Sequence, residues 1–430
     1  MIQRNLLDEL KAHLSQREIS LIIGPRQAGK TTLMFILMDY LRKRGEKTLF
    51  LSLDFESDQQ FFVSQRSLMG KIELEMGKER GFVFIDEIQR KENAGLFLKG
   101  LYDSNLPYKF IVSGSGSLEL KEKIHESLVG RKRLFQLGTI TFDEFVNFKT
   151  DCRYQGRLPD FFAIERDRTE GMLLEYLNFG GYPRVVLASD MREKARIIDE
   201  IYRSYLERDI GFLLRVEKTE AFSALIKILA SQIGMLINYS ELSSTLGIAL
   251  KTVKDYLWYA EKTFVVNKVT PYFRNVRKEI SKSPVFYFND LGLRNYALGL
   301  FGNLISPSEA GFVFQNLVFN ILREELMFTP GRIHFWRTKD RAEVDFIIDL
   351  ARRVIPVEVK FKKMKDPVIG RSLRSFVRRY QPEEAWVVNL DLRQDLRLDK
   401  TVIRFFPFFE LLGGKRVLPG IRGGICNDMQ

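Results

Sequence analysis

One segment restricts this 430-residue chain to a narrow set of folds. Residues 24–32 read GPRQAGKTT, follow the apolar run Ile19–Ile23 and precede the apolar run Leu33–Leu41. The segment fits the pattern G-x-x-x-x-G-K-[ST], whose glycines let backbone N–H groups turn inward around phosphates at the start of a helix. A strand, a loop and a helix in this order predict an α/β fold with a nucleoside triphosphate site.

The residues of this loop have different expected roles. Lys30 adds a mobile positive charge for the phosphates, and the Thr31 hydroxyl is expected to bind Mg²⁺. The predicted cofactors are therefore ATP and Mg²⁺. The residues predicted to bind the nucleotide are Gly24, Pro25, Arg26, Gln27, Ala28, Gly29, Lys30, Thr31, Thr32 and, from a later strand, Ser113.

Two adjacent acids end a second apolar strand. Residues Phe82–Ile85 are all apolar and are followed by Asp86 and Glu87. Because ligands gather at the carboxyl ends of the strands in open α/β sheets, Asp86 is expected to lie beside the Mg²⁺. Glu87 is placed to polarise the attacking water. The alternative is a strand end with two exposed acids.

Two further strands complete the α/β pattern. Residues Lys109–Ser115 end in small polar side chains, and either Ser113 or Ser115 could bond the terminal phosphate or the water. An ordinary Ser/Gly loop is the alternative. Residues Lys47–Asp54 supply a fourth strand at α/β spacing.

Taken together, these motifs resemble a large group of prokaryotic AAA+ ATPases of the archaeal type. The resemblance rests on residues 24–32, 84–89 (FIDEIQ), 112–115 (VSGS), 130–131 (GR), 142–145 (FDEF), 180–183 (GGYP) and 202–210 (YRSYLERDI). It implies an AAA+ module, a helical lid, a winged-helix-like segment and a C-terminal α/β domain of unknown function that is similar to restriction-type nucleases. The corresponding division of the chain is 1–150, 151–220, 221–280 and 281–430.

An AAA+ ring would complete each active site with an arginine from the neighbouring subunit. Arg131 and Arg133 are the candidates, with a solvated basic turn as the alternative. Arg184 could reach the nucleotide from the lid, and Arg26 could form a salt bridge to the lid. The expected assembly is a homo-oligomer, in which Lys30, Glu87 and Arg131 are the predicted catalytic residues.

The middle of the chain predicts helices. Apolar residues recur at helical spacing from Glu170 to Leu229, which indicates the lid. Residues 238–257 are typical of a helix–turn–helix, with Ser240 as the cap of the first helix and Gly247 in the turn. Such a segment either reads DNA or contacts another protein.

A second chemical constellation lies in the C-terminal region. Asp345 and Glu358 stand on two expected strands, where they could share a divalent metal, and Lys360 lies on the same face as Glu358. This order resembles the D…E-x-K arrangement of the restriction-nuclease-like fold, in which the acids bind Mg²⁺ and the lysine positions water or stabilises phosphate charge. Related chains usually carry a Glu on the preceding helix, where this one has Gln315. A neutral amide is a poorer ligand, so binding without cleavage is expected; a hairpin with solvent-facing acids is the alternative.

Charge and composition limit the possible partners. The net charge is +12, and 17 Lys and Arg oppose 11 Asp and Glu between Arg332 and Lys400. DNA is the polyanion expected as a partner, and a merely basic surface is the alternative. Two distant cysteines and three scattered histidines predict neither a disulfide framework nor a zinc site. We expect no signal peptide and no membrane span, and a cytoplasmic location.

The sequence therefore predicts an ATPase that moves its lid on hydrolysis and acts on DNA through its basic C-terminal domain. Two alternatives remain open. One is a nucleotide-dependent switch that binds a protein partner, and the other is a metal-dependent nuclease gated by ATP.

Overall fold

The computed structural model describes residues 2–115, 128–205, 219–273, 283–304, 307–351 and 353–412. Internal contacts separate two compact units, each assembled from three stretches of the chain. The first unit comprises Met1–Ile140, Tyr182–Phe222 and Asp255–Val265, and the second comprises Thr141–Gly181, Ser223–Lys254 and Val266–Gln430. The four-domain division expected from the sequence stays a prediction.

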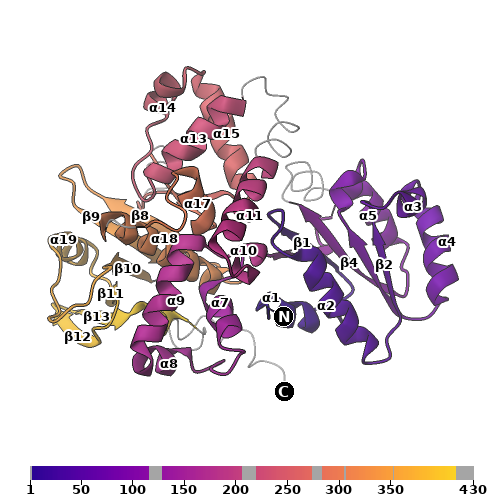
Figure 1. The fold of residues 1–430 in the computed structure, drawn as a ribbon, viewed down its shortest axis with the longest axis horizontal. Coiled ribbons are helices and arrows are strands. Elements are labelled where there is room, and N and C mark those ends of the chain that lie inside the picture. Colours follow the sequence, from indigo (N-terminus) through magenta and orange to yellow (C-terminus); the bar gives the residue numbers. More distant parts are fainter. Residues whose placement is uncertain are drawn as a thin grey trace. The chain divides into compact units, whose positions relative to one another are not determined.

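The first unit is built on a parallel five-stranded sheet (Figure 1). The strand order is β2-β3-β4-β1-β5, so β4 pairs with both β1 and β3. Every residue of β1, β3 and β4 is buried, as expected for parallel strands with both faces covered. The strands are β1 (Ile19–Gly24), β2 (Thr48–Ser52), β3 (Gly81–Asp86), β4 (Tyr108–Ser115) and β5 (Lys132–Gln136).

Helices cover the two faces of this sheet with separate hydrophobic cores. α1 and α2 pack against Ile22 and Phe84 on one face, whereas α4 and α5 pack against Leu21 and Val83 on the other. Successive strand residues point to opposite faces, so the same apolar strands supply both cores. The helices are α1 (Leu6–Ala12), α2 (Lys30–Arg42), α3 (Glu56–Gln59), α4 (Gln65–Met76) and α5 (Ala94–Asp103), with 3₁₀ helices η1 (Gln60–Phe62) and η2 (Ile88–Arg90).

This architecture confirms the predicted α/β class with a phosphate-loop parallel sheet. The expected strands Lys47–Asp54 and Lys109–Ser115 correspond to β2 and β4. β5 has no counterpart among the expected strands, because this edge strand begins with Lys132 and Arg133 and buries only Phe135 fully. Amphipathic edge strands lack the continuous apolar run by which buried strands are recognised.

Two further helices of the first unit are α10 (Pro183–Leu187) and α11 (Met191–Ser204). Asp190 caps α11, because its Oδ2 accepts the Glu193 N–H at 3.0 Å. Ile197, Ile198 and Ile201 are buried along α11. The motif at 202–210 begins within this helix, and its residues 206–210 lie outside the described residues.

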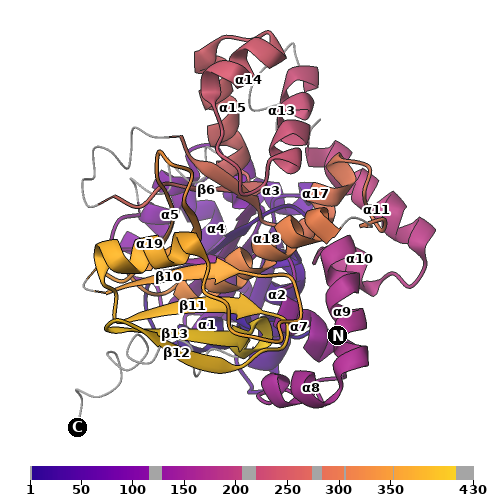
Figure 2. The same ribbon diagram turned by 90° about the vertical axis from the view of Figure 1, so that its left-hand side faces the viewer.

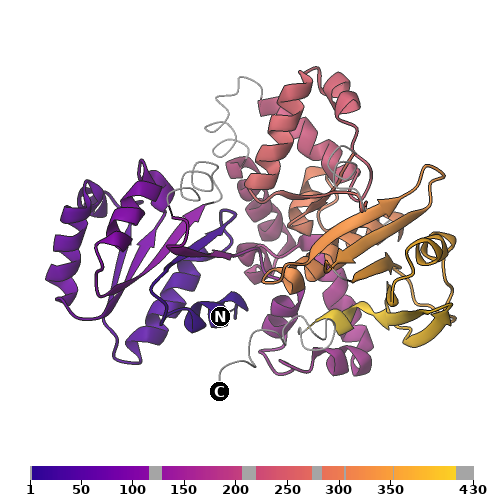
Figure 3. The same ribbon diagram turned by 180° about the vertical axis from the view of Figure 1, so that it is seen from behind.

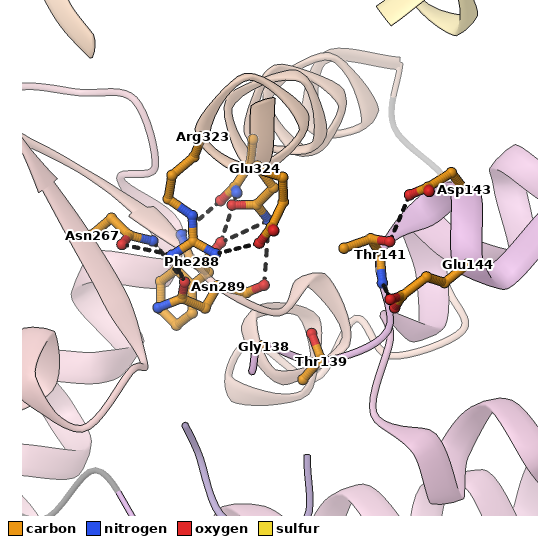
Figure 4. Close-up of polar contacts among 12 residues, drawn as sticks. Gly138, Thr139, Thr141, Asp143, Glu144, Asn267, Phe288, Asn289, Arg323 and Glu324 are labelled. Carbon is orange, nitrogen blue, oxygen red and sulfur yellow. Dashed lines mark hydrogen bonds and ion pairs between the residues drawn. The ribbon is translucent and has the colours of Figure 1, made fainter. Parts of the chain in front are cut away.

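Most of the remaining helices belong to the second unit. α7 begins with a capping box, in which the Thr141 N–H donates to Glu144 Oε2 at 3.0 Å (Figure 4). α13 and α15 cross the boundary between the units. The helices are α7 (Phe142–Lys149), α8 (Leu158–Ile164), α9 (Arg166–Phe179), α13 (Thr219–Ser231), α14 (Tyr239–Leu246), α15 (Leu250–Lys262), α17 (Leu291–Ala297) and α18 (Pro307–Leu326).

α14 and α15 occupy the segment expected to form a helix–turn–helix. Gly247 ends α14 with a φ of 62°, in the left-handed region that suits glycine. The predicted cap is wrong, because Asn238 and not Ser240 caps α14: Asn238 Oδ1 accepts the Ser240 N–H at 3.0 Å. An antiparallel pair, β6 (Val266–Val269) and β7 (Val285–Phe288), follows. The winged-helix likeness stays a prediction.

A mixed six-stranded sheet forms the centre of the second unit (Figure 2). Its order is β12-β13-β11-β10-β9-β8, with an antiparallel β8–β9 hairpin that is seen from behind in Figure 3. β10 pairs antiparallel with β9 and parallel with β11. The strands are β8 (Arg332–Arg337), β9 (Glu343–Asp349), β10 (Val354–Val359), β11 (Glu384–Asn389), β12 (Gln394–Leu398) and β13 (Thr401–Pro407), followed by η4 (Phe408–Leu411).

Two helices pack against the strands of the second unit. α19 (Arg371–Tyr380) buries Leu373 and Phe376 against side chains of the sheet. Within the second unit, Arg323 of α18 donates to Asn267 Oδ1 at 3.0 Å and to Glu324 Oε1 at 3.3 Å (Figure 4). This guanidinium connects α18 to the small β6–β7 sheet.

Within the described ranges, the helices are too short or too polar to cross a membrane.

A substitution at the end of β1 tests the close packing of the first sheet. Gly24→Ala would place a Cβ 2.0 Å from the Leu137 carbonyl oxygen, so part of the backbone must move. We expect the free energy of unfolding in urea to fall by about 1–3 kcal/mol. The matched control is Gly70→Ala in α4, where a Cβ would meet no atom within 4 Å. The control should be neutral or stabilising by up to about 1 kcal/mol, and equal stabilities of the two variants would contradict the close approach.

Candidate functional site

The predicted phosphate loop connects β1 to α2. Gly29 caps α2 with a φ of 91°, a conformation that glycine adopts without strain, and Gln27 has a positive φ of 59°. At the end of β1, the Leu137 N–H donates to the Ile23 carbonyl at 2.8 Å. The loop therefore starts from a strand that is paired on both sides.

Lys30 lies beneath its own loop. The residue is 5% exposed, and its Nζ donates to the carbonyls of Pro25 at 2.9 Å and Gly24 at 3.2 Å. A buried ammonium needs such partners. The carbonyls hold the charge at the N-terminus of α2, the end at which a helix attracts anions.

The structure brings Thr31, Asp86 and Ser113 together from three separate elements. Thr31 Oγ1 donates to Asp86 Oδ2 at 2.9 Å, and Ser113 Oγ donates to Asp86 Oδ1. β3, β4 and β1 are neighbours and run parallel, so their carboxyl ends meet at one edge of the sheet. Asp86 is 4% exposed, which excludes the alternative of a solvated acid at this position.

Glu87 adopts an unusual backbone conformation next to this cluster. Its φ of 56° is rare for a residue with a side chain, and its N–H donates to Ser113 Oγ at 3.3 Å. The Glu87 carboxylate accepts a hydrogen bond from Gln89 Nε2, while Gln89 Oε1 accepts the Ser115 N–H at 3.1 Å. Gln89 therefore links the carboxylate to the end of β4.

The sequence did not predict that Gln89 and Arg4 contribute to this site. Gln89 lies inside the FIDEIQ motif, so its spacing from Glu87 was a usable signal. Arg4 offered none: it precedes the motif by twenty residues and becomes part of the site only through folding. Its guanidinium donates to the carbonyls of Ala28 at 2.9 Å, Gly138 at 2.8 Å and Thr139 at 3.1 Å. Arg4 thus fastens the phosphate loop to the segment after β5.

Arg184 reaches the phosphate loop from α10. Its Nη1 donates to Gln27 Oε1 at 3.3 Å and to Glu200 Oε2 of α11 at 2.9 Å. Arg26 is an exposed residue of the same loop. The expected contact of Arg184 with nucleotide and that of Arg26 with the lid stay predictions.

Arg131 and Arg133 lie away from the phosphate loop of their own subunit. β5 starts beside Ile19, at the beginning of β1, whereas the loop follows the end of β1. Arg131 Nε donates to Asp103 Oδ1 at 2.7 Å, and this bond lowers the pKa of the Asp103 carboxyl. Arg133 lies 3.7 Å from a Glu9 oxygen. A role for Arg131 is therefore confined to a neighbouring subunit and stays a prediction.

The second constellation also assembles, at one end of β9 and β10. Asp345 Oδ2 accepts the Val359 N–H at 2.7 Å, and Asp345 Oδ1 accepts from Gln315 Nε2 of α18 at 3.1 Å. Glu358 forms an ion pair of 2.5 Å with Lys360. The pairing of Phe346 with Val357 places Asp345 and Glu358 next to each other on the two antiparallel strands.

Burial affects the pKa of the Asp345 carboxyl. It raises the pKa of the Asp345 carboxyl to about 7, opposed by the Val359 N–H and reinforced by the negative charge of Glu358. Glu358 is 9% exposed, and its Oε2 has no hydrogen-bond partner among the described residues. The two carboxylates are thus packed closely in a site that disfavours two negative charges.

Among the described residues, no three His, Cys, Asp or Glu side chains lie close enough together to bind a metal ion. Asp345 and Glu358 form a pair, and the third position is held by the Gln315 amide, whose NH₂ group faces Asp345. An amide that donates to a carboxylate does not offer its oxygen to a metal at the same point.

Three family models match consecutive parts of the chain. Residues 16–146 match a model described as an AAA domain. Residues 170–304 and 310–409 match two models described as domains of unknown function, DUF8612 and DUF4143. The chain therefore contains an AAA domain and a C-terminal DUF4143 domain, which confirms the predicted resemblance to AAA+ ATPases with a C-terminal domain of unknown function.

Several relatives are similar to this protein along most of its chain. An uncharacterized protein of Mycobacterium tuberculosis is 28% identical over 382 residues, 87% of this chain and 76% of the relative. An uncharacterized protein of Haemophilus influenzae is 28% identical over 373 residues, 84% of this chain and 87% of the relative. The crystal structure of Cdc6p from Pyrobaculum aerophilum covers 70% of this chain and 95% of its own, with 10% identity and a TM-score of 0.30. This TM-score is too low to carry an argument.

The raised pKa of Asp345 predicts a pH dependence. A carboxyl with a folded-state pKa near 7 favours folding while it is protonated; this contribution is fully present below about pH 4 and is lost as the pH rises through about 7. Replacing Asp345 by Asn removes the titration, so the variant should gain stability relative to wild type between pH 5 and pH 8.

Urea unfolding in EDTA, followed by tryptophan fluorescence, measures this difference, since Trp336 and Trp386 lie in the six-stranded sheet. Asp399→Asn is the control, because Asp399 is exposed in a turn with a φ of 52° that Asn also tolerates. A pH-independent difference between Asp345→Asn and wild type would refute the assignment.

Proposed function

We propose that the AAA domain of this chain binds and hydrolyses ATP with Mg²⁺, and that hydrolysis is coupled to DNA binding by the basic C-terminal domain. The observation that carries the ATPase is the cluster at the ends of β1, β3 and β4. There Thr31, Asp86 and Ser113 share hydrogen bonds next to Glu87. The match of residues 16–146 to an AAA domain supports the same chemistry.

The side chains of Thr31 and Asp86 are suited to bind the Mg²⁺ ion of a nucleotide. Mg²⁺ prefers oxygen ligands and is usually held by one or two protein oxygens together with phosphates. The Thr31 hydroxyl and the Asp86 carboxylate, 2.9 Å apart, supply such oxygens. The metal would supply charge neutralisation on the phosphates. Lys30 and the backbone N–H groups of the loop, Pro25 excepted, would hold the phosphates at the start of α2.

Glu87 is the group proposed to orient the attacking water. Its carboxylate is engaged by Gln89, which also accepts the N–H of Ser115 on β4. A general base must reach the water it activates, and release of the Gln89 contact with Oε2 would make both carboxylate oxygens of Glu87 available to the water. Movement of β4 by a bound partner would change this contact, and turnover would thereby depend on the partner.

Arg184 is the proposed link between the nucleotide and the lid. In the first unit it joins Gln27 of the phosphate loop to Glu200 of α11. An anion bound in the loop attracts the same guanidinium. Exchange of Arg184 from Glu200 to phosphate would move α10 and α11, which is the lid motion predicted from the sequence.

The first experiment compares ATP turnover at low salt with and without single-stranded, duplex and forked DNA. We expect duplex-stimulated turnover that falls as salt rises, because phosphate contacts weaken with salt. Glu87→Gln should lower turnover by at least about a hundredfold while nucleotide binding persists. Lys30→Ala should lose nucleotide binding itself. Turnover retained by Glu87→Gln would remove Glu87 from the proposed role.

The competing function is a nucleotide-dependent switch that binds a protein partner. Slow turnover in the wild type that is indifferent to every DNA would favour it over the DNA-coupled motor. The proposed ring, in which Arg131 of one subunit completes the site of the next, would be compatible with either function. It requires Arg131 to leave Asp103.

A nuclease is the second candidate activity, favoured by the buried, unpartnered Oε2 of Glu358. The Gln315 amide that donates to Asp345 argues against it. We expect no cleavage of plasmid DNA by wild type in Mg²⁺ or Mn²⁺, with or without ATP. Gel analysis of the plasmid measures this. Cleavage that disappears in Asp345→Ala would overturn the expectation and establish a nuclease.

A further inference from the structure

α19 presents two very different sides. Leu373, Phe376 and Val377 are buried against the six-stranded sheet. The exposed residues of the helix are Arg371, Arg374, Ser375, Arg378 and Arg379. The helix contains four arginines and no acid, and Figure 2 shows it lying along the sheet near β10. Its outward side is therefore a continuous basic surface.

The four arginines are not neutralised by neighbours. In the part of the chain that the structure describes, no Asp or Glu forms an ion pair with any of them. Arg374 only donates to the Ile369 carbonyl at 3.3 Å, and Arg379 lies over the Tyr380 ring at 5.5 Å. On α11, by contrast, Arg196 and Arg203 pair with Glu193 and Asp199. A cluster of charge of one sign creates a surface potential that attracts partners of the opposite charge.

The surroundings of α19 extend the same charge. Lys339 and Arg341 are exposed in the turn between β8 and β9, which is tied to α19 because the Glu343 N–H donates to Ser372 Oγ at 3.1 Å. Residues 332–380 contain 14 Lys and Arg against 6 Asp and Glu, a surplus of 8, whereas residues 381–400 contain 3 against 5. The basic surplus of the C-terminal domain is thus concentrated around this helix.

We infer that α19 is the element with which the C-terminal domain grips the sugar–phosphate backbone of duplex DNA, through Arg371, Arg374 and Arg378. This inference rests on the proposed DNA-coupled function and names its binding surface. Residues spaced three and four apart lie on one face of a helix. From Arg371 to Arg378 the helix rises about 10.5 Å, which matches about three base-pair steps of 3.4 Å along the axis of a duplex.

The outward side of α19 favours a duplex over other polyanions. Single strands are usually held by aromatic side chains that stack on bases, but Phe376 is buried and the Tyr380 ring packs on Phe376 at a centroid distance of 4.5 Å. Protein interfaces have an apolar or aromatic centre, and none of the exposed α19 residues is apolar. Arginines without stacking or apolar partners suit a regular phosphate backbone.

The position of α19 also relates this surface to the carboxylate pair. The helix begins after Gly370, where a Cβ would lie 2.8 Å from Glu358 Oε1. DNA lying along the arginines would pass the Asp345–Glu358 site at the start of the helix.

The test compares the triple variant Arg371→Gln, Arg374→Gln, Arg378→Gln with wild type in a salt titration of fluorescein-labelled duplex DNA binding. Gln keeps the helix propensity of Arg, and circular dichroism checks the fold. The matched control is Arg192→Gln, Arg196→Gln, Arg203→Gln, which removes the same charge from exposed positions of α11. We expect the α19 variant to bind about tenfold or more weakly at low salt, with a log–log salt slope shallower by about 2–3. The α11 variant should bind like wild type.

Equal binding by wild type and the α19 variant, or an equal loss in both variants, would overturn the inference. Binding of single-stranded DNA with the same affinity and the same dependence on α19 would overturn the preference for a duplex. Binding of a polyglutamate peptide but not DNA, lost in the α19 variant, would replace DNA by an acidic protein. Equilibrium DNA binding requires no hydrolysis, so the titration tests the α19 surface independently of the ATPase. The proposed ATPase is tested by the turnover of the wild type with and without DNA.

Discussion

The central position of β4 in the parallel sheet is the constraint on which the nucleotide site depends. β4 pairs with β1 on one side and β3 on the other, so its end lies between the phosphate loop and the acids. Ser113 can therefore bond both the Asp86 carboxylate and the Glu87 N–H. Parallel strands bring their carboxyl ends to one edge, and this edge is where ligands bind in open α/β sheets. A different strand order would separate the same residues.

The phosphate loop is also held from outside the sheet. Arg4 binds the Ala28 carbonyl of the loop and the carbonyls of Gly138 and Thr139, close to Ile140 where the first stretch of the first unit ends. A guanidinium with several donors in a fixed plane suits such a bridge, because each carbonyl constrains the other two. Arg4 thereby links the loop to the segment at which the chain leaves the first unit.

Two buried titratable groups differ in their partners. At Lys30, carbonyl acceptors offset the cost of burying the charge, whereas at Asp345 burial favours the neutral acid. The Gln315 amide adds a donor beside Asp345 without adding charge. Asp345 therefore favours its neutral form, while Arg371, Arg374 and Arg378 of α19 are exposed to solvent. This contrast is the physical reason for proposing that the C-terminal domain binds a phosphate backbone and does not cleave it with a metal.

The sequence by itself determined the class of the fold and predicted the residues of the candidate nucleotide site. The pattern at 24–32 and the strand ending in Asp86 and Glu87 can be read locally, because phosphate loops and buried parallel strands leave short, contiguous signals. The same holds for Gly247, which a left-handed helix end requires. The edge strand β5 was missed because it lacks a continuous apolar run. The cap at Asn238 was missed although Glu241, three residues later, gives the spacing typical of a helix start.

The tertiary structure alone decided which distant residues meet. Arg4 at the phosphate loop, Gln89 between Glu87 and Ser115, and Gln315 on Asp345 follow from strand order and helix packing. The structure also distinguishes the arginines of two helices. Arg196 and Arg203 of α11 have acidic partners, whereas those of α19 have none among the described residues. Composition counts charges, but only the folded chain places each one beside a carboxylate or in solvent.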